Sequence, residues 1–142
     1  MLQGANLPDT GVGIGEFECY LLAKSRTGEV WGGVGLELRG ADALLRSLIV
    51  RPGRRGAGVG RGLVAAAENL ARGQGINTLY LLTLDAAAFF LELGFVEQRR
   101  ETAPRGILET GEFASVCPAS AVCLRKQLTP LASAASLRER SL

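Results

Sequence analysis

Hydrophobic and polar positions in the first half of the chain predict three short strands. Glu18 to Ser25 is typical of a strand, and the polar run Arg26-Thr27-Gly28-Glu29 predicts a hairpin turn before a partner strand over Val30 to Arg39. After a break at Gly40-Ala41-Asp42, the apolar and partly β-branched stretch Ala43 to Val50 predicts a third strand. We therefore expect an antiparallel meander.

The pattern then changes from a strand period to a helix period. From Gly60 to Arg72 the apolar residues recur at i, i+1, i+4, i+7 and i+8, which indicates an amphipathic helix with Gly73 placed to cap its end. The continuous apolar run Ile76 to Thr83 predicts a central strand buried on both faces. Asp85 is expected to N-cap a short helix over Ala86 to Leu93.

Two further strands complete the expected fold. They are predicted over Phe95 to Arg100 and Ser120 to Leu128, with an irregular stretch between them. The order β-β-β-α-β-α-β-β describes a mixed α/β (α+β) domain with helices against a curved, mostly antiparallel sheet. We expect this domain to span residues 1–128, followed by a helical or disordered tail over 129–142 to which we assign no chemistry.

Composition limits the protein to one compact domain. The chain has 142 residues, 47% of them hydrophobic, which suits a single core. The net charge of +2 is too small to indicate a nucleic-acid-binding protein, so any anion site must be local. The chain shows neither an apolar run of the roughly 18–20 residues that cross a membrane nor a signal-peptide pattern, so we expect a cytoplasmic protein.

The sequence also excludes several catalytic systems. It contains no histidine, and Cys19, Cys117 and Cys123 form no CxxC pair. Ser/His and Cys/His nucleophilic systems are therefore ruled out, and no metal site is expected.

Between the third strand and the first helix lies a segment rich in glycine and arginine. Glycines allow close approach of the backbone, and a helix N-terminus adds positive potential, so the segment suits a phosphate group. The alternative is a flexible basic connection. A P-loop is excluded because no lysine lies between Lys24 and Lys126, and the GxGxGxG spacing does not match the GxGxxG of dinucleotide-binding folds.

Three ordered motifs resemble those of the GNAT superfamily of N-acetyltransferases. Arg55-Gly56-Ala57-Gly58-Val59-Gly60 matches the (Q/R)xxGx(G/A) segment between that family's fourth strand and third helix. Leu48-Ile49-Val50-Arg51-Pro52 looks like the LxVxP strand end before it, and Phe89 to Phe95 looks like the FYxxxGF motif. Together they favour the phosphate-binding interpretation.

The resemblance implies acetyl-CoA as the cofactor. In this family the fourth and fifth strands splay apart, and the pantetheine arm fills the gap like an extra strand. The implied cofactor-binding residues are Leu48, Ile49, Val50, Arg55, Gly56, Ala57, Gly58, Val59, Gly60, Arg61, Phe89 and Phe90.

Acetyl transfer also requires an oxyanion donor and a neutral amine. A backbone N–H near Leu48 is the expected donor. Glu37 is the best candidate base, acting through water, and its alternative is an outward-facing strand residue. Phe90 stands where the family has the tyrosine that acts as general acid, so this chain lacks a general acid at that position. A thiolate is a tolerable leaving group without one, because the reference pKa of a thiol is about 8.5.

The resemblance also suggests an acceptor. Arg46 and Ser47 lie in a strand similar to that of amino-acid N-acetyltransferases, in which this arginine binds the substrate carboxylate; the alternative is that Arg46 extends to the surface. The stretch Phe113 to Leu124 is similar to the ending of GNAT proteins associated with arsenic resistance, which places Ser120 near the carboxylate. We therefore expect a small glutamate-like or arsenical amine acceptor, Cys123 being more simply a buried strand residue.

The N-terminal part is shorter than the family's usual first strand and two helices. Either the N-terminal strand is missing, or the protein is rebuilt there and exposes a sheet edge that a second copy of the chain would cover as a homodimer. The missing tyrosine at Phe90 and this shortening also allow a non-catalytic acyl-CoA-binding module.

Overall fold

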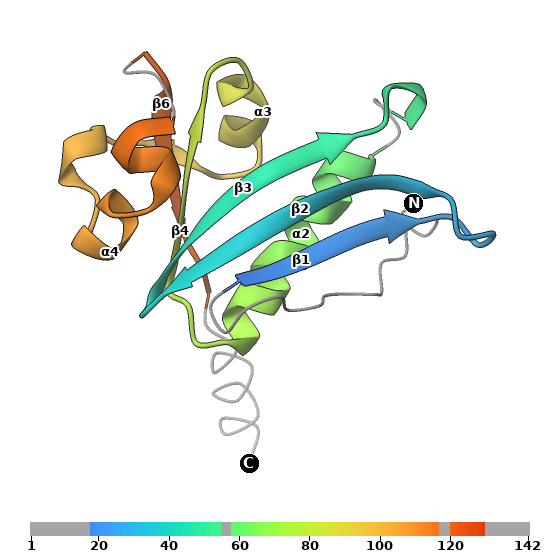
Figure 1. The fold of residues 1–142 in the computed structure, drawn as a ribbon, viewed down its shortest axis with the longest axis horizontal. Coiled ribbons are helices and arrows are strands. Elements are labelled where there is room, and N and C mark those ends of the chain that lie inside the picture. The colour runs from blue at the N-terminus through green and yellow to red at the C-terminus, as the bar shows by residue number, and fades with distance from the viewer. Residues whose placement is uncertain (1–17, 55–57, 117–119, 130–142) are drawn as a thin grey trace, which may run out of the picture.

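The computed structural model describes residues 18–54, 58–116 and 120–129. Its six strands form one mixed sheet in the order β1-β2-β3-β4-β6-β5 (Figure 1). The strands are β1 Glu18–Lys24, β2 Val30–Arg39, β3 Asp42–Val50, β4 Thr78–Thr83, β5 Val96–Glu97 and β6 Val122–Gln127. The longer helices are α2 Val59–Gly73 and α3 Ala87–Glu92, and the short helical segments are η1 Pro52–Arg54, η2 Arg100–Thr102, α4 Arg105–Leu108 and η3 Glu112–Val116.

The expected mixed α/β fold is confirmed. Strands β1 to β3 form an antiparallel meander, and α2 then crosses behind it to connect β3 with the parallel strand β4 (Figure 1). Strand β6 pairs antiparallel with both β4 and β5. The sheet therefore consists of two antiparallel halves that meet at a short parallel junction between β3 and β4.

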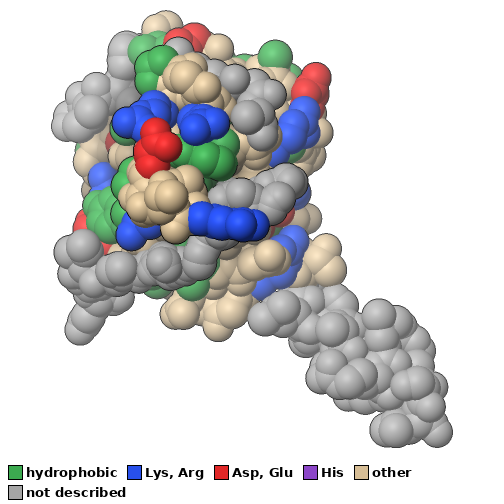
Figure 2. Space-filling model, turned by 90° about the vertical axis from the view of Figure 1, so that its right-hand side faces the viewer, with side chains coloured by type: hydrophobic (Ala, Val, Ile, Leu, Met, Phe, Trp, Pro, Cys, Tyr) green, Lys and Arg blue, Asp and Glu red, His purple; other side chains and the backbone are tan. Residues whose placement is uncertain are grey.

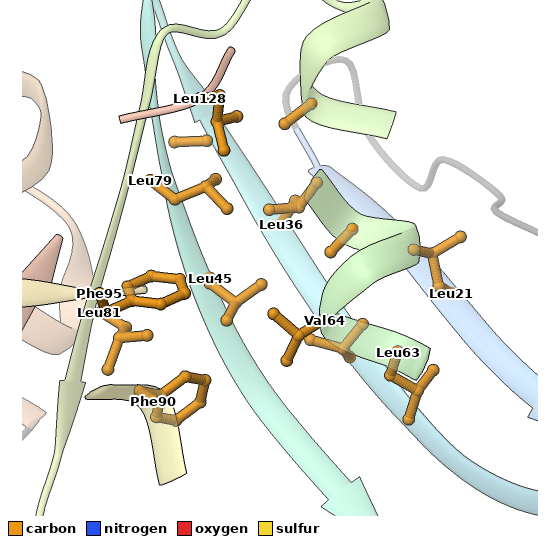
Figure 3. Close-up of a cluster of buried hydrophobic side chains, with 14 of the residues drawn as sticks. Leu21, Leu36, Leu45, Leu63, Val64, Leu79, Leu81, Phe90, Phe95 and Leu128 are labelled. Carbon is orange, nitrogen blue, oxygen red and sulfur yellow. The ribbon is translucent and has the colours of Figure 1, made fainter. Parts of the chain in front are cut away.

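The main core lies between α2 and the sheet. Figure 3 shows leucine and valine side chains from α2 against leucines of β1 to β4, closed at one end by Phe90 and Phe95. A second buried cluster on the other face of the sheet contains Leu44, Tyr80 and Cys123 with Ile107 of α4. Successive residues of β4 point into the two clusters, so the prediction of a central strand buried on both faces is confirmed.

The end of α2 differs from the sequence prediction. The helix ends at Gly73, but the residue with left-handed backbone is Gly75, at φ +81°. The N–H of Ile76 donates to the carbonyl of Ala71, at 3.0 Å, which is the six-to-one bond of a Schellman motif. Gly75 is therefore the glycine that terminates the helix, because only it must adopt a positive φ.

Two other local predictions were wrong. Asp85 does not cap α3; the N–H of Ala86 donates instead to the hydroxyl of Thr83, at 3.0 Å. The strand expected over Phe95 to Arg100 is only two residues long, because the chain turns into helical segments from Arg100 onward. The stretch expected to be irregular thus contains η2, α4 and the π-helical turn η3, which build one wall of the second core.

Candidate active site

Strands β3 and β4 separate after a short parallel ladder. Their pairing runs from Asp42 with Thr78 to Leu44 with Tyr80, and beyond it the two strands diverge, with α3 beside the open end (Figure 1). A cavity of about 540 Å³ lies along the outer part of β3, lined by Leu48, Ile49, Val50, Gly58, Gly60, Arg61 and Phe89. A second cavity of about 360 Å³ lies between Leu45–Leu48 and the end of β4, and Phe90 also lines it.

An extra residue in β3 marks the junction of these cavities. The register with β2 shifts between Gly33–Ile49 and Gly35–Arg46, which is a β-bulge, and Ser47 has a left-handed backbone with φ +58°. Such a conformation in a residue other than glycine costs on the order of 1–3 kcal/mol and is often found next to active sites. The bulge also resets the alternation, so that Leu45, Leu48 and Val50 all pack on the α2 side.

The N-terminus of α2 forms the other wall of the first cavity. Gly58 precedes the helix with φ +85°, and its first turn contains no acidic residue. A Cβ on Gly60 would lie 3.3 Å from Cζ of Phe89 and 3.7 Å from Cγ2 of Val50, so glycine keeps this wall open. The dipole of this 15-residue helix stabilises an anion at its N-terminus by about 0.3–1 kcal/mol. The wall therefore fits a phosphate-bearing ligand; Arg55, Gly56 and Ala57 lie outside the described residues.

The arginines around this cavity are paired with carboxylates. Glu29 accepts bonds from Arg51 and from the indole N–H of Trp31, and Arg54 stacks over the Trp31 ring at 4.2 Å. The Trp31 hydrogen bond, followed by the two arginines, lowers the pKa of Glu29. Arg61, which lines the cavity, pairs with Glu92 of α3 at 3.1 Å. Figure 2, which views this end of the molecule, accordingly shows basic side chains next to acidic and hydrophobic ones.

On the sheet face opposite α2, Glu37 and Arg46 belong to one charged cluster. A guanidinium nitrogen of Arg46 donates to the Tyr20 hydroxyl at 2.9 Å and to Glu18 at 3.3 Å, and its Nε lies 3.7 Å from Glu37. Glu37 also pairs with Arg39, and its side chain is only 12% exposed. The Nε groups of both arginines are buried without a hydrogen-bond partner among the described residues. Glu37 is therefore a partly buried carboxylate held between two cations.

Glu112, on η3, is a site residue that the sequence did not indicate. Burial raises the pKa of its carboxyl, the Arg46 cation opposes that rise, and the Glu37 carboxylate adds to it. Glu112 therefore lies within electrostatic range of Arg46 and Glu37. It is 66 positions from Arg46, in a stretch expected to be irregular, so no local pattern relates the two residues.

The remaining predicted site residues differ in their surroundings. Phe90 is 5% exposed and packs edge-on against Phe89 and Phe95, with ring centroids 5.0 and 5.4 Å away. Val59 is buried in the core, and Ser120 is exposed in the turn before β6. Cys123 is buried, which raises its pKa to about 11, whereas Cys117 lies outside the described residues.

Lys126 of β6 holds the two helices of the site together. Its ammonium group donates to Glu68 of α2 at 2.9 Å and to the carbonyl of Leu93, at the end of α3, at 2.7 Å. Glu68 is a buried carboxylate that also faces Arg72 at 3.7 Å. The ammonium thus ties the end of α3, which carries Phe89, to α2.

A family model matches the part of the chain that carries the sequence motifs, and this match shows the family. A family model described as the acetyltransferase (GNAT) domain matches residues 16–97, which is more than half of the 142 residues. The chain belongs to the GNAT acetyltransferase family. It is accordingly an N-acetyltransferase that uses acetyl-CoA, and the gap between β3 and β4, with the glycine-lined start of α2, fits that cofactor.

Solved structures share this fold. A GNAT-family acetyltransferase from Staphylococcus aureus Mu50 has a TM-score of 0.65 at 22% identity, covering 79% of this chain and 69% of that one. N-acetylglutamate synthase from Neisseria gonorrhoeae, solved with coenzyme A and N-acetyl-glutamate, has a TM-score of 0.70 at 22% identity and covers 78% of this chain. The match spans only 26% of the synthase.

A third structure with this fold was also solved with coenzyme A. The PaiA N-acetyltransferase from Thermoplasma acidophilum has a TM-score of 0.62 at 17% identity, over 78% of this chain and 61% of that one. A comparison with curated protein sequences finds no match. No helix among the described residues has the length and apolar character needed to cross a membrane.

Proposed function

We propose that the protein transfers the acetyl group of acetyl-CoA to the amine of a small amino-acid-like acceptor, by direct attack in a ternary complex. The observation that carries this proposal is the bulge at Ser47. It brings the cofactor gap and the Arg46 cluster to the same point of β3, one on each side of the strand. A donor in the gap and an acceptor on the sheet face would therefore meet there.

The chain's own residues suggest how the cofactor is held. Beyond Leu44 no ladder joins β3 to β4 in the described part of the chain, which leaves room along β3 for an extended arm. The N–H groups at the start of α2 face the pyrophosphate in this arrangement. Acetyl-CoA supplies a thioester whose carbonyl carbon accepts the amine. Arg51, Arg54 and Arg61 are paired with Glu29 and Glu92, so a phosphate must compete with those carboxylates.

Arg46 is the proposed contact for an acceptor carboxylate. Its longest hydrogen bond is the one to Glu18, whose side chain is 37% exposed. A ligand carboxylate can take the place of Glu18 and keep a charge-assisted bond to the guanidinium. Ser47 and Ser120 are the proposed polar neighbours of that carboxylate. Glutamate-like and arsenical amino acids are the acceptors that the sequence resemblance adds to this geometry.

Proton transfer has two candidate carboxylates. Glu37 is paired with Arg39 and Arg46, so its carboxylate is already engaged by two cations. Burial makes Glu112 more basic than an ordinary glutamate, since it raises the carboxyl pKa. We propose that one of these carboxylates takes the amine proton through water. Phe90 supplies no acid, so the departing thiolate is released unprotonated or is protonated by water.

A thiol-release assay with a panel of amines tests this function. Release of free coenzyme A with a substrate amino acid, together with an acetylated product of the expected mass, supports an enzyme. Binding of acetyl-CoA without turnover on any amine would favour the non-catalytic acyl-CoA-binding module, which the phenylalanine at position 90 allows. Glutamate and an arsenical analogue belong in the panel alongside neutral and basic amino acids.

Three further proposals concern the cellular location, the domain bounds and the oligomeric state. We propose a cytoplasmic protein whose acetyltransferase domain covers residues 1–128, with residues 129–142 as a tail. We also propose a homodimer, because β1 pairs only with β2 among the described strands and thus leaves one edge available. Light scattering on the purified chain measures the oligomeric state directly, and a monomer at micromolar concentration would remove the dimer.

A further inference from the structure

An apolar groove lies on the sheet face opposite α2, outside the cofactor gap. Its volume is about 350 Å³, within the range of small-molecule sites. Side chains of Tyr20, Leu22, Trp31 and Ile49 line it. Leu22 and Ile49 are 41% and 65% exposed, so these hydrocarbon groups face solvent in the described structure. A cluster of exposed apolar side chains beside a catalytic centre is typical of a ligand site.

Two glycines of β2 shape this groove: Gly33 lines it, and Gly35 lies under the ring of Tyr20, which lines it. A Cβ on Gly35 would come within 3.0 Å of the Tyr20 ring, and a Cβ on Gly33 within 3.1 Å of the Leu22 side chain. The absence of side chains at these positions lets Tyr20 and Leu22 of β1 lie across the strand. The groove is therefore formed by a specific arrangement of β1, β2 and β3 rather than by a loop.

The groove is continuous with the proposed reaction centre. Ser47 at the bulge lines both this groove and the cavity between β3 and β4. At the same end, the Tyr20 hydroxyl accepts the hydrogen bond from Arg46. At the other end is Arg51, which is already paired with Glu29. Polar groups thus lie at the two ends, and hydrocarbon lies between them.

We infer that this groove binds an apolar or aromatic side chain of the acceptor, while Arg46 binds its carboxylate next to Ser47. This inference rests on the proposed function and narrows its acceptor. A second carboxylate in the groove would lose water and would have to displace Glu29 from Arg51 to gain a cationic partner. An amino acid with a single carboxylate and an aromatic side chain therefore fits better than glutamate.

A binding experiment tests the groove independently of catalysis. Trp31 is the chain's single tryptophan, so its fluorescence reports a ligand in the groove. We expect N-acetyl-L-phenylalanine to change the emission and to bind at least about 10-fold more tightly than N-acetyl-L-glutamate. Leu22→Ser should weaken the phenylalanine derivative about 10-fold and leave the glutamate derivative unchanged. Leu91→Ser, which changes a similarly exposed leucine on α3 at 48%, is the matched control.

Turnover separates a failure of the groove from a failure of the function. With acetyl-CoA saturating, kcat/KM should be higher for L-phenylalanine than for L-glutamate and should fall in Leu22→Ser for phenylalanine only. Tighter binding or faster turnover of the glutamate compounds, or an equal effect of Leu22→Ser on both, would overturn the inference. If no amine is acetylated, the proposed function fails, and the fluorescence titration alone then decides whether the groove binds an aromatic ligand.

Discussion

The gap between β3 and β4, where we propose that the cofactor binds, meets the charged cluster around Arg46, our proposed acceptor face, at Ser47. The two are built from different parts of the chain. The gap depends mainly on backbone: a short parallel ladder, a bulge, and glycines at the start of α2. The acceptor face depends on side chains that come from β1, β2, β3 and η3. Backbone features belong to contiguous segments, whereas the side-chain cluster exists only after folding. The fold therefore explains the cofactor more completely than the acceptor.

The largest expected effect is on the cofactor side, at Gly60. A valine there would place a branched side chain against Phe89 and fill the first cavity. We expect Gly60→Val to weaken coenzyme A binding at least about 100-fold, or about 2.7 kcal/mol, measured by calorimetry. Gly73→Val, at the other end of the same helix with no neighbour within 4 Å of its Cβ, is the control. Unchanged affinity in Gly60→Val would place the cofactor elsewhere.

On the acceptor side, Cys123 is expected to be chemically inert in the folded protein. Burial raises its pKa from 9.0 to about 11, so at pH 8 its thiolate fraction is about 100-fold smaller than normal. Iodoacetamide labelling followed by peptide mass analysis should modify Cys123 about 100-fold more slowly in the folded chain than in urea. Labelling of folded Cys123 as fast as that of the half-buried Cys19 would reopen a direct role for this thiol with an arsenical acceptor.

Removal of the Arg46 guanidinium should affect the acceptor and not the cofactor. We expect Arg46→Ala to raise the acceptor KM about 30-fold, or about 2 kcal/mol, without changing the KM of acetyl-CoA. Arg46→Lys should recover only part of the loss, because an ammonium cannot make a bidentate contact. Arg99→Ala removes a solvent-exposed arginine paired with Glu101 and serves as the control. An unchanged acceptor KM in Arg46→Ala would remove its proposed role.

The smallest expected effect concerns the pH dependence of stability. Burial raises the pKa of Glu112 above its ordinary 4.5, so the folded protein binds this proton more tightly than the unfolded chain does. The ionised carboxylate is therefore unfavourable in the folded state, and its contribution to stability falls as pH rises through 4.5 and the higher folded pKa. Urea unfolding should show Glu112→Gln more stable than the parent at pH 7 and not at pH 4. An equal gain in stability at pH 7 and pH 4 would show that the substitution acts through packing and not through the charge of Glu112.

Much of the fold was predictable because its signals are local. The meander, the amphipathic helix and the doubly buried strand β4 all follow from periodicity within single segments. Helix boundaries were less predictable: Thr83 competes with Asp85 for the start of α3, and Gly75 ends α2 instead of Gly73. In both cases two residues that lie two positions apart have suitable chemistry, and the backbone path determines which one is used.

The candidate site also contains residues that the sequence predicted and residues that it did not. The predicted cofactor-binding residues from Leu48 to Gly60 lie close together in the sequence and carry the motif of the family. Glu112 and the apolar groove were not predictable, because they depend on which face of each strand is exposed and on where η3 packs. Ser47 shows a third case: nothing in its sequence neighbourhood indicates a left-handed residue, and the bulge that requires it follows from the register with β2.

A crystal structure of the protein with coenzyme A tests the central claim most directly. The proposed function predicts the pyrophosphate at the N-terminus of α2, the pantetheine arm along β3 from Val50 toward Leu48, and the sulfur beside the Ser47–Leu48 peptide, facing the Arg46 cluster. A cofactor bound outside the gap between β3 and β4, or a sulfur directed away from Ser47, would contradict it.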